Sequence, residues 1–291
     1  MSEFTAQYGI IGDPVEHSLS PLMHNTAFKA LNVLAEFKLF PLKAHEIEGF
    51  FKNLKQADCP IFGLNVTVPY KEVVLEYLDN LTLFAQKVGA VNTIVITPQR
   101  KLIGYNTDAP GFMAHLVELG FSTAGKRVAI LGSGGSCRAI LATLCMIPER
   151  PQSIKIYNRT RERAEALLKD LGGRIDLSIV DQVASIDDMN IELADLLINA
   201  TSAGLRKEDP CLVSGELIHG NMLVYDLIYN PPETKLLKMA KVKGAQAVNG
   251  LGMLFYQGVL SFQHWANIQL DDAIKQKMRR SLEEGARHGR D

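Results

Sequence analysis

RVAILGSGGS, residues 127–136, is a short apolar run that ends abruptly in glycine and serine. The apolar part predicts a buried strand, and the residues up to Met146 predict a helix that Pro148 and Pro151 end. Glycines let the backbone turn tightly and approach a pyrophosphate, which the free N–H groups of a helix N-terminus can bind. Cys137 stands where the third glycine of G-x-G-x-x-G would be, so an ordinary glycine-rich turn is the alternative.

The residues that follow continue the same alternation of strands and helices. Apolar runs at 154–157, 196–200 and 223–227 predict strands, and the pattern of 161–171 predicts a helix. A glycine-rich turn inside such a βαβ succession is typical of a Rossmann dinucleotide-binding domain. We expect this domain to span residues 110–250.

The first part of the chain predicts a second α/β unit. Short apolar runs alternate with helical patterns there, without any internal repeat of the dinucleotide-binding part. We expect an open α/β substrate-binding and catalytic domain over residues 1–109, completed by the helices of residues 251–291. The fold class is therefore α/β with two domains, and the active site is expected in the cleft between them, where closure could exclude water.

The end of the second strand of the dinucleotide-binding pattern indicates which cofactor is bound. NAD enzymes usually carry an acid there for the ribose 2′-hydroxyl, but this chain has Asn158-Arg159-Thr160, with Arg163 one helical turn later. A guanidinium can grip a 2′-phosphate through two hydrogen bonds, whereas a carboxylate would repel it. NADP(H) is therefore expected. Arg161 and Arg163 could instead be solvated helix residues that pair with neighbouring glutamates.

The stretch NVTVPYK, residues 65–71, places polar side chains at the end of a strand expected over 61–68. Strand alternation turns Leu64, Val66 and Val68 to one face and Asn65 and Thr67 to the other.

Lys71 directly follows this strand. Pro69 suits a first helical position, so a helix over 71–78 would hold Lys71 in its first turn, where the positive end of the helix dipole disfavours a lysine. A lysine kept against its electrostatic preference indicates function, and an ordinary surface lysine is the alternative.

Two further stretches place polar residues before expected helices. Asp108 lies in GYNTD, residues 104–108, and either Thr107 or Asp108 could cap the helix that follows. Ser18 and Ser20 precede Pro21, and Ser20 could likewise be a helix cap. Both stretches could equally supply ligands to a site.

Composition excludes several classes of protein. The 291 residues are 47% hydrophobic and 22% charged, which is ordinary for a globular protein. The formal net charge of -1 gives no indication of binding to nucleic acid or to an anionic membrane. Four cysteines without a C-x-x-C pair favour reduced thiols, and no metal-ligand spacing is present. Because neither a signal peptide nor a transmembrane run is visible, a cytoplasmic protein is expected, as a monomer or a homodimer.

Seven short motifs together resemble the shikimate dehydrogenase family, in the family's order and over essentially the whole chain. They are HSLSP at 17–21, NVTVPYK at 65–71, GAVNT at 89–93, NTD at 106–108, NRT at 158–160, NATS at 199–202 and NGLGM at 249–253. The resemblance implies an NADP-dependent oxidoreductase acting on a CH–OH group. Its reaction would be the reversible reduction of 3-dehydroshikimate to shikimate in chorismate and aromatic amino-acid biosynthesis.

The resemblance also implies roles for particular residues. Lys71 and Asp108 would form the catalytic pair. The substrate would be held by Ser18, Ser20, Thr67, Asn92, Asp108, Tyr229 and Gln257. The cofactor would be bound by Gly132, Ser133, Gly134, Gly135, Ser136, Asn158, Arg159, Thr160 and Arg163, with Leu227 and Gly250 near the nicotinamide.

Gln257 has support from its own surroundings. It shares a helix face with Met253, Leu260 and His264, and an amide on a partly apolar face needs hydrogen-bond partners when it is buried. A ligand hydroxyl would serve, as would a loop carbonyl.

The sequence has two alternative functional interpretations. A quinate or dual quinate/shikimate enzyme using NAD would resemble relatives that carry Thr in place of Ser20 and Asp after the second strand, and neither is present here. A non-catalytic ligand sensor on the same fold would not need both Lys71 and Asp108.

Overall fold

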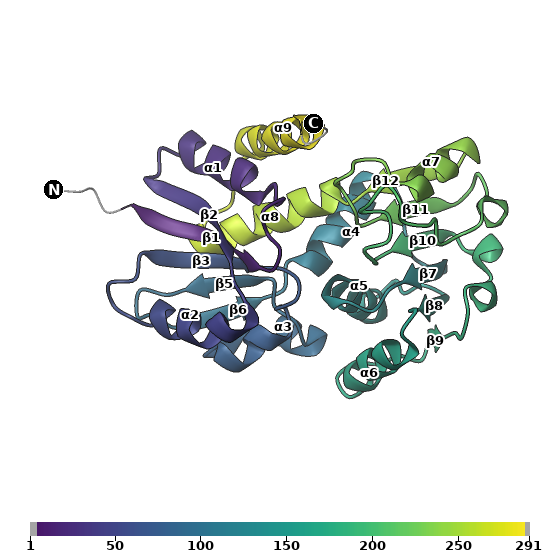
Figure 1. Ribbon diagram of the computed structural model, residues 1–291, viewed down its shortest axis with the longest axis horizontal. Coiled ribbons are helices and arrows are strands. Elements are labelled where there is room, and N and C mark those ends of the chain that lie inside the picture. Colours follow the sequence, from purple (N-terminus) through teal and green to yellow (C-terminus); the bar gives the residue numbers. More distant parts are fainter. Residues whose placement is uncertain (1–4, 289–291) are drawn as a thin grey trace. The chain divides into compact units, whose positions relative to one another are not determined.

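The computed structural model describes residues 5–288, which divide into two compact units. Within that range, the first unit comprises residues 5–111 and 254–285, and the second comprises residues 112–253 and 286–288. Each unit is built around one six-stranded sheet with helices packed against it (Figure 1). Among the described helices, none is long and apolar enough to cross a bilayer.

The sheet of the first unit is mixed. Its strands are β1 (Ala6–Gly12), β2 (Ala35–Pro41), β3 (Ile61–Val66), β4 (Asn80–Leu81), β5 (Thr93–Ile96) and β6 (Leu102–Tyr105), in the order β2-β1-β3-β5-β6-β4. Strands β1, β2 and β3 are parallel, while β5 is antiparallel to both β3 and β6. Because of this reversal, the carboxyl ends of β1, β3 and β6 meet the amino end of β5 at one edge of the sheet.

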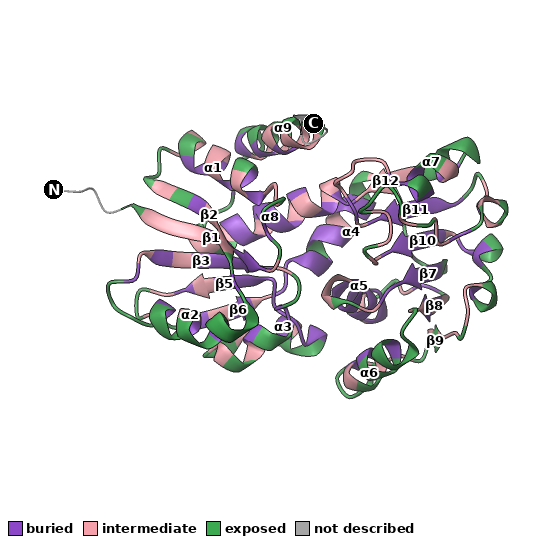
Figure 2. Ribbon diagram, viewed as in Figure 1, coloured by how far each residue is buried: buried purple, intermediate pink, exposed green. Residues whose placement is uncertain are grey.

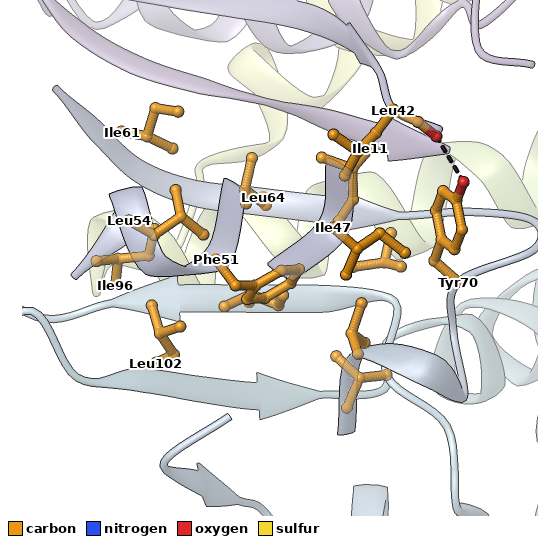
Figure 3. Packing of buried hydrophobic residues seen from close by; sticks show 14 of the residues in the cluster. Ile11, Leu42, Ile47, Phe51, Leu54, Ile61, Leu64, Tyr70, Ile96 and Leu102 are labelled. Atoms are coloured by element: carbon orange, nitrogen blue, oxygen red, sulfur yellow. Dashed lines mark hydrogen bonds between the residues drawn. The ribbon is translucent and has the colours of Figure 1, made fainter. Parts of the chain in front are cut away.

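Helices cover both faces of this sheet. They are α1 (Ser20–Ala30), η1 (Ala44–Glu46), α2 (Ile47–Leu54), η2 (Val73–Tyr77), α3 (Leu83–Val88), α8 (Leu251–Ala266) and α9 (Asp272–His288), together with the start of α4 (Asp108–Glu118). Helix α2 buries Phe51 and Leu54 against Leu64 of β3, as Figure 3 shows, and leaves its outer face exposed (Figure 2). At the rim of this cluster the Tyr70 hydroxyl donates a hydrogen bond of 2.5 Å to the carbonyl oxygen of Leu42.

The opposite face of β3 meets helix α8. A Cβ added to Gly63 would lie 2.4 Å from Cδ1 of Trp265, so the absence of a side chain there lets the helix approach the strand. The Asn65 amide, two residues further along, donates to the Ser261 hydroxyl at 3.0 Å. Strand alternation therefore places Leu64 and Asn65 on opposite faces, as the sequence predicts.

The second unit has the Rossmann topology. Its parallel strands are β7 (Arg127–Leu131), β8 (Ser153–Tyr157), β9 (Val180–Gln182), β10 (Leu196–Asn199), β11 (Leu223–Asp226) and β12 (Gln246–Asn249), in the order β12-β11-β10-β7-β8-β9. Numbered from β7, this is the 3-2-1-4-5-6 order of dinucleotide-binding domains. Its helices are α5 (Gly135–Met146), α6 (Arg161–Gly172) and α7 (Lys235–Val242), with the short turns η3 (Asp187–Met189), η4 (Ile191–Leu193) and η5 (Gly215–Leu217).

Two expectations for the segment after β3 are wrong. The strand ends at Val66, so Val68 lies outside it and is 61% exposed. In place of the expected helix over 71–78 there is only the short 3-10 helix η2, which starts two residues after Lys71. A short segment with two adjacent β-branched valines has little intrinsic preference for a regular helix. The dipole-based reason for regarding Lys71 as functional is therefore wrong.

Candidate active site

The sheet edge of the first unit brings together Lys71, Asn92 and Asp108. Lys71 follows β3, Asn92 immediately precedes β5, and Asp108 follows β6 as the first residue of α4. These are the strand ends that the reversed direction of β5 places at the same edge. The topology thus gathers three polar side chains that are separated along the sequence.

Lys71 and Asp108 form a buried ion pair. The Lys71 Nζ lies 2.5 Å from Oδ2 of Asp108, and the two side chains are 9% and 8% exposed. A buried charge is costly unless it is paired, so each group fixes the position of the other. Lys71 is therefore not the surface lysine of the alternative interpretation.

Asp108 does not act as the helix cap that its position allowed. Its Oδ1 accepts a hydrogen bond of 2.9 Å from Nδ2 of Asn92, while Lys71 contacts Oδ2. The backbone N–H of Ala109 donates instead to Oδ1 of Asn106, at 3.3 Å. The carboxylate is thus directed toward the lysine and the amide.

The amide of Asn92 has one orientation. Its Oδ1 accepts from the backbone N–H of Thr107 at 2.7 Å, and a backbone N–H can only donate. The Nδ2 group must therefore be the one that faces Asp108. It also lies 2.9 Å from Oγ1 of Thr107 and 3.2 Å from Oε1 of Gln257.

Gln257 lies in this network, on helix α8, with 7% of its surface exposed. Its Nε2 donates to the carbonyl oxygen of Leu254 at 2.8 Å, and its Oε1 accepts from Asn92. The protein thus supplies partners for a buried amide, as the sequence required. The sequence motifs did not predict that Thr93 and Ser261 also belong to this network. Their spacing could have indicated it, because Thr93 adjoins Asn92 and Ser261 lies one helical turn after Gln257.

The serines expected to bind substrate flank the start of α1. The Oγ of Ser18 accepts from the backbone N–H of Ser20 at 3.3 Å. Ser20 is the first residue of α1 rather than its cap, because Leu19 holds the cap position, and Ser20 is 2% exposed. The cap interpretation of Ser20 is therefore wrong.

The other two expected substrate ligands lie in different units. Thr67 follows β3, and its backbone N–H donates to the carbonyl oxygen of Ile11 on β1 at 2.9 Å. Tyr229 lies in the second unit, three residues after β11, and is half-buried.

The glycine-rich turn of the second unit joins β7 to α5. Gly132 has φ +110°, and a Cβ there would lie 2.7 Å from the carbonyl oxygen of Ala200, so only glycine fits. The 12-residue helix α5 begins directly afterwards at Gly135, while Ser133, Gly135 and Ser136 are half-buried and Gly134 is exposed. Cys137, at the third glycine position, is buried, and its Sγ lies 3.0 Å from the carbonyl oxygen of Gly132.

The arginines expected to bind the cofactor lie in the turn after β8 and at the start of α6. Arg159 and Arg163 are exposed and make no ion pair among residues 5–288, whereas Arg161 pairs with Glu165 at 2.7 Å. Asn158 and Thr160 complete the turn, where the Asn158 amide donates to the carbonyl oxygen of Thr160 at 2.7 Å. Arg161 is thus the solvated helix residue of the alternative interpretation. The other two guanidinium groups remain exposed, and no acidic residue lies at the strand end.

Gly250 and Leu227 are in close contact within the second unit. A Cβ on Gly250 would lie 2.1 Å from the carbonyl oxygen of Leu227, so any side chain there would displace the chain after β11. Gly250 therefore fixes the backbone that carries Leu227.

Comparisons with known proteins identify the family. The model of the shikimate dehydrogenase substrate-binding domain matches residues 10–94, and that of shikimate/quinate 5-dehydrogenase matches residues 115–209. A shikimate dehydrogenase (NADP⁺) of Methanopyrus kandleri is 40% identical over 284 residues, 96% of this chain and 95% of the relative. The chain belongs to the shikimate dehydrogenase family.

Solved structures of the family share the fold. The shikimate dehydrogenase of Aquifex aeolicus matches with a TM-score of 0.85 and 34% identity, covering 96% of this chain and 99% of that one. The enzyme of Thermus thermophilus, in complex with NADP(H) and shikimate, matches with a TM-score of 0.81 and 32% identity, over 97% and 100% of the two chains. The two-unit α/β fold and the family resemblance predicted from the motifs are thereby confirmed.

Proposed function

We propose that this member of the shikimate dehydrogenase family is an NADP-dependent shikimate dehydrogenase, which reversibly reduces 3-dehydroshikimate to shikimate in chorismate and aromatic amino-acid biosynthesis. The observation that carries the proposal is the buried Lys71–Asp108 pair, oriented by Asn92. A non-catalytic ligand sensor would have no need of a paired, buried ammonium group. The names of the relatives agree with this activity.

Lys71 would act directly on the ketone oxygen. NADPH, when bound, would supply the hydride for the ketone carbon, and negative charge would develop on the ketone oxygen. The protonated Lys71 stabilises that charge and donates a proton to the oxygen, while Asp108 holds the ammonium group in place. In the reverse direction Lys71 accepts the proton of the substrate hydroxyl.

The remaining polar groups would orient the substrate ring. Asn92, Asp108 and Gln257 offer amide and carboxylate groups for ring hydroxyls at the sheet edge. Ser18, Ser20, Thr67 and Tyr229 would bind the substrate carboxylate and the hydroxyls through their own hydroxyl groups. Such positioning lowers the entropic part of the barrier, because the reacting atoms are already aligned.

The cofactor would be held by the second unit. The turn of Gly132, Ser133, Gly134, Gly135 and Ser136 at the N-terminus of α5 suits the pyrophosphate. Asn158, Arg159, Thr160 and Arg163 would bind the adenosine 2′-phosphate, with Leu227 and Gly250 beside the nicotinamide. This arrangement favours NADP(H) over NAD(H).

The decisive experiment compares Lys71→Ala with the wild type in shikimate oxidation. A positioned acid or base typically contributes 10²–10⁴ in rate, so we expect kcat to fall by on the order of 10²–10⁴. Shikimate affinity, measured by equilibrium titration, should change much less, because the lysine acts mainly on charge that develops in the transition state.

Two further variants sharpen this experiment. Asp108→Asn should also lower kcat, and the double variant should lose less than the product of the single losses, because the pair works as a unit. Lys55→Ala is the matched control: Lys55 also pairs with an aspartate in the first unit, Asp79 at 3.3 Å, but it is 45% exposed. Folded Lys71→Ala protein with near-native kcat would contradict the mechanism, and preferential oxidation of quinate with NAD⁺ would contradict the assigned substrate and cofactor.

A further inference from the structure

Three hydroxyl groups form a buried cluster next to Asn92. Thr93 lies on β5, Thr107 follows β6 and Ser261 lies on α8; the three residues are 0%, 1% and 0% exposed. The Oγ1 of Thr93 lies 2.7 Å from Oγ of Ser261 and 3.0 Å from Oγ1 of Thr107, and the last two atoms are 3.1 Å apart. We call these three residues the hydroxyl cluster.

Some neighbours of the cluster can only accept a hydrogen bond and others can only donate one. These neighbours determine where the hydroxyl protons of the cluster lie. Ser261 donates to the carbonyl oxygen of Gln257 at 2.9 Å, since a carbonyl can only accept. The Ser261 oxygen is then free to accept from Thr93 and from the Asn65 amide, which lies 3.0 Å away. The Nδ2 group of Asn92 can only donate, and it lies 2.9 Å from Oγ1 of Thr107, so the Thr107 proton is available to Thr93 at 3.0 Å. In this arrangement the hydrogen bonds run from Asn92 through Thr107 and Thr93 to Ser261.

On the basis of the proposed function, we propose that Ser261 is a positioning residue for ketone reduction. Ser261 fixes the position of Asn92 through Thr93 and Thr107. Asn92 in turn orients Asp108 toward Lys71. Ser261 takes no part in the hydrogen bonds of the catalytic pair itself, which join Lys71, Asp108 and Asn92. The hydroxyl cluster connects Ser261 to the side-chain amide of Asn92 through Thr93 and Thr107.

The position of Asn92 is sensitive to the cluster because its Nδ2 group has more acceptors than protons. Its two protons face Asp108 at 2.9 Å, Thr107 at 2.9 Å and Gln257 at 3.2 Å. A shift of the Thr107 hydroxyl changes how these protons are shared, and so changes the hydrogen bond to Asp108. Small displacements of catalytic groups have large kinetic effects, since a misplacement of about 1 Å can cost on the order of 10²-fold in rate.

The test is a double-mutant cycle between Ser261→Ala and Asn92→Ala, measured in shikimate oxidation with NADP⁺. We expect Ser261→Ala alone to lower kcat by roughly tenfold, below that upper figure because the backbone N–H of Thr107 still holds Asn92, and to leave the KM for NADP⁺ unchanged. In the Asn92→Ala background the same substitution should lower kcat by less than about twofold, because the group through which it acts is gone.

Two further variants keep the outcome clear. Ser281→Ala is the matched control, because it removes another serine–carbonyl hydrogen bond of the first unit, from Ser281 to Leu22 at 2.9 Å, and it should retain native kcat. Thr93→Val removes a cluster hydroxyl with little change of shape, and it repeats the cycle if Ser261→Ala does not fold.

The outcomes separate this inference from the proposed function. Wild-type protein that does not oxidise shikimate would contradict the proposed function itself. If the wild type is active, native kcat in folded Ser261→Ala or Thr93→Val protein would overturn the positioning role. Equal losses with and without Asn92 would also overturn it, because they would show a general effect on the fold.

Discussion

His24 should make the first unit sensitive to mild acid. The residue lies on α1, is fully buried and packs between aromatic rings, with ring centroids 4.5 Å from Phe37 and 5.0 Å from Trp265. Neither ring nitrogen has a partner at hydrogen-bonding geometry among the described residues. Burial lowers the pKa of His24 to about 3, although the nearby Asn65 side chain opposes the shift. The native ring therefore stays neutral where an unfolded histidine is protonated.

The size of the effect follows from this difference in pKa. Between pH 6.5 and about 3 the unfolded chain binds one more proton than the native chain, so stability is present above pH 6.5 and is lost as the pH falls. One bound proton changes the free energy of unfolding by about 1.36 kcal/mol for each pH unit. Because an unfolded histidine is only partly protonated near pH 6.5, His24 should cost about 2 kcal/mol between pH 7 and pH 5.

Urea unfolding of the wild type and of His24→Leu at pH 7 and pH 5 measures this cost. The chain has one tryptophan, Trp265, which contacts His24, so its fluorescence reports on the unfolding of the first unit. His24→Leu changes packing at both pH values but cannot titrate. It should therefore lose about 2 kcal/mol less than the wild type on going from pH 7 to pH 5.

A second histidine supplies the control for this measurement. His45→Gln, at an exposed position of the same unit, should retain the pH dependence of the wild type. Equal losses of stability in the wild type and in His24→Leu would show that the buried ring is protonated in the native state, and the reasoning would fail.

Two further predictions concern the second unit. Arg159→Ala should raise the KM for NADP⁺ by roughly ten- to hundredfold, because charge-assisted hydrogen bonds to a phosphate contribute ~1.5–3 kcal/mol. The KM for NAD⁺ should hardly change, and steady-state kinetics showing equal losses with both cofactors would refute the 2′-phosphate role. Burial raises the pKa of Asp226 above its usual range, although hydrogen bonds from Thr234, Ile228 and Asn199 oppose the shift. The native state therefore holds the carboxyl proton more tightly than the unfolded state does. The native state should lose stability as the pH rises from about 4. Relative to Asp226→Asn, the wild type should therefore have a higher Tm at pH 4 than at pH 7 by calorimetry, whereas Tm curves that stay parallel would contradict a raised pKa.

Local chemistry determined the features that the sequence predicted well. The strand, glycine turn and helix of residues 127–146 depend on neighbours along the chain: an apolar run, a residue that tolerates φ +110°, and a helix that proline ends. The family resemblance likewise rests on short motifs, and it indicated Lys71 and Asp108 as the catalytic pair. The prediction of a helix over 71–78 was wrong because the local helix propensity there is weak. The surrounding structure determines the backbone conformation instead.

Tertiary structure alone decided how the site is assembled. Asn65 and Ser261 are 196 residues apart, and they meet because Gly63 lets α8 approach the sheet. Lys71 is buried and paired because β5 reverses direction and brings the ends of β3 and β6 to one edge. Sequence patterns report periodicity and local propensity, whereas contacts between distant segments depend on strand order and direction, and these are fixed only when the whole sheet forms.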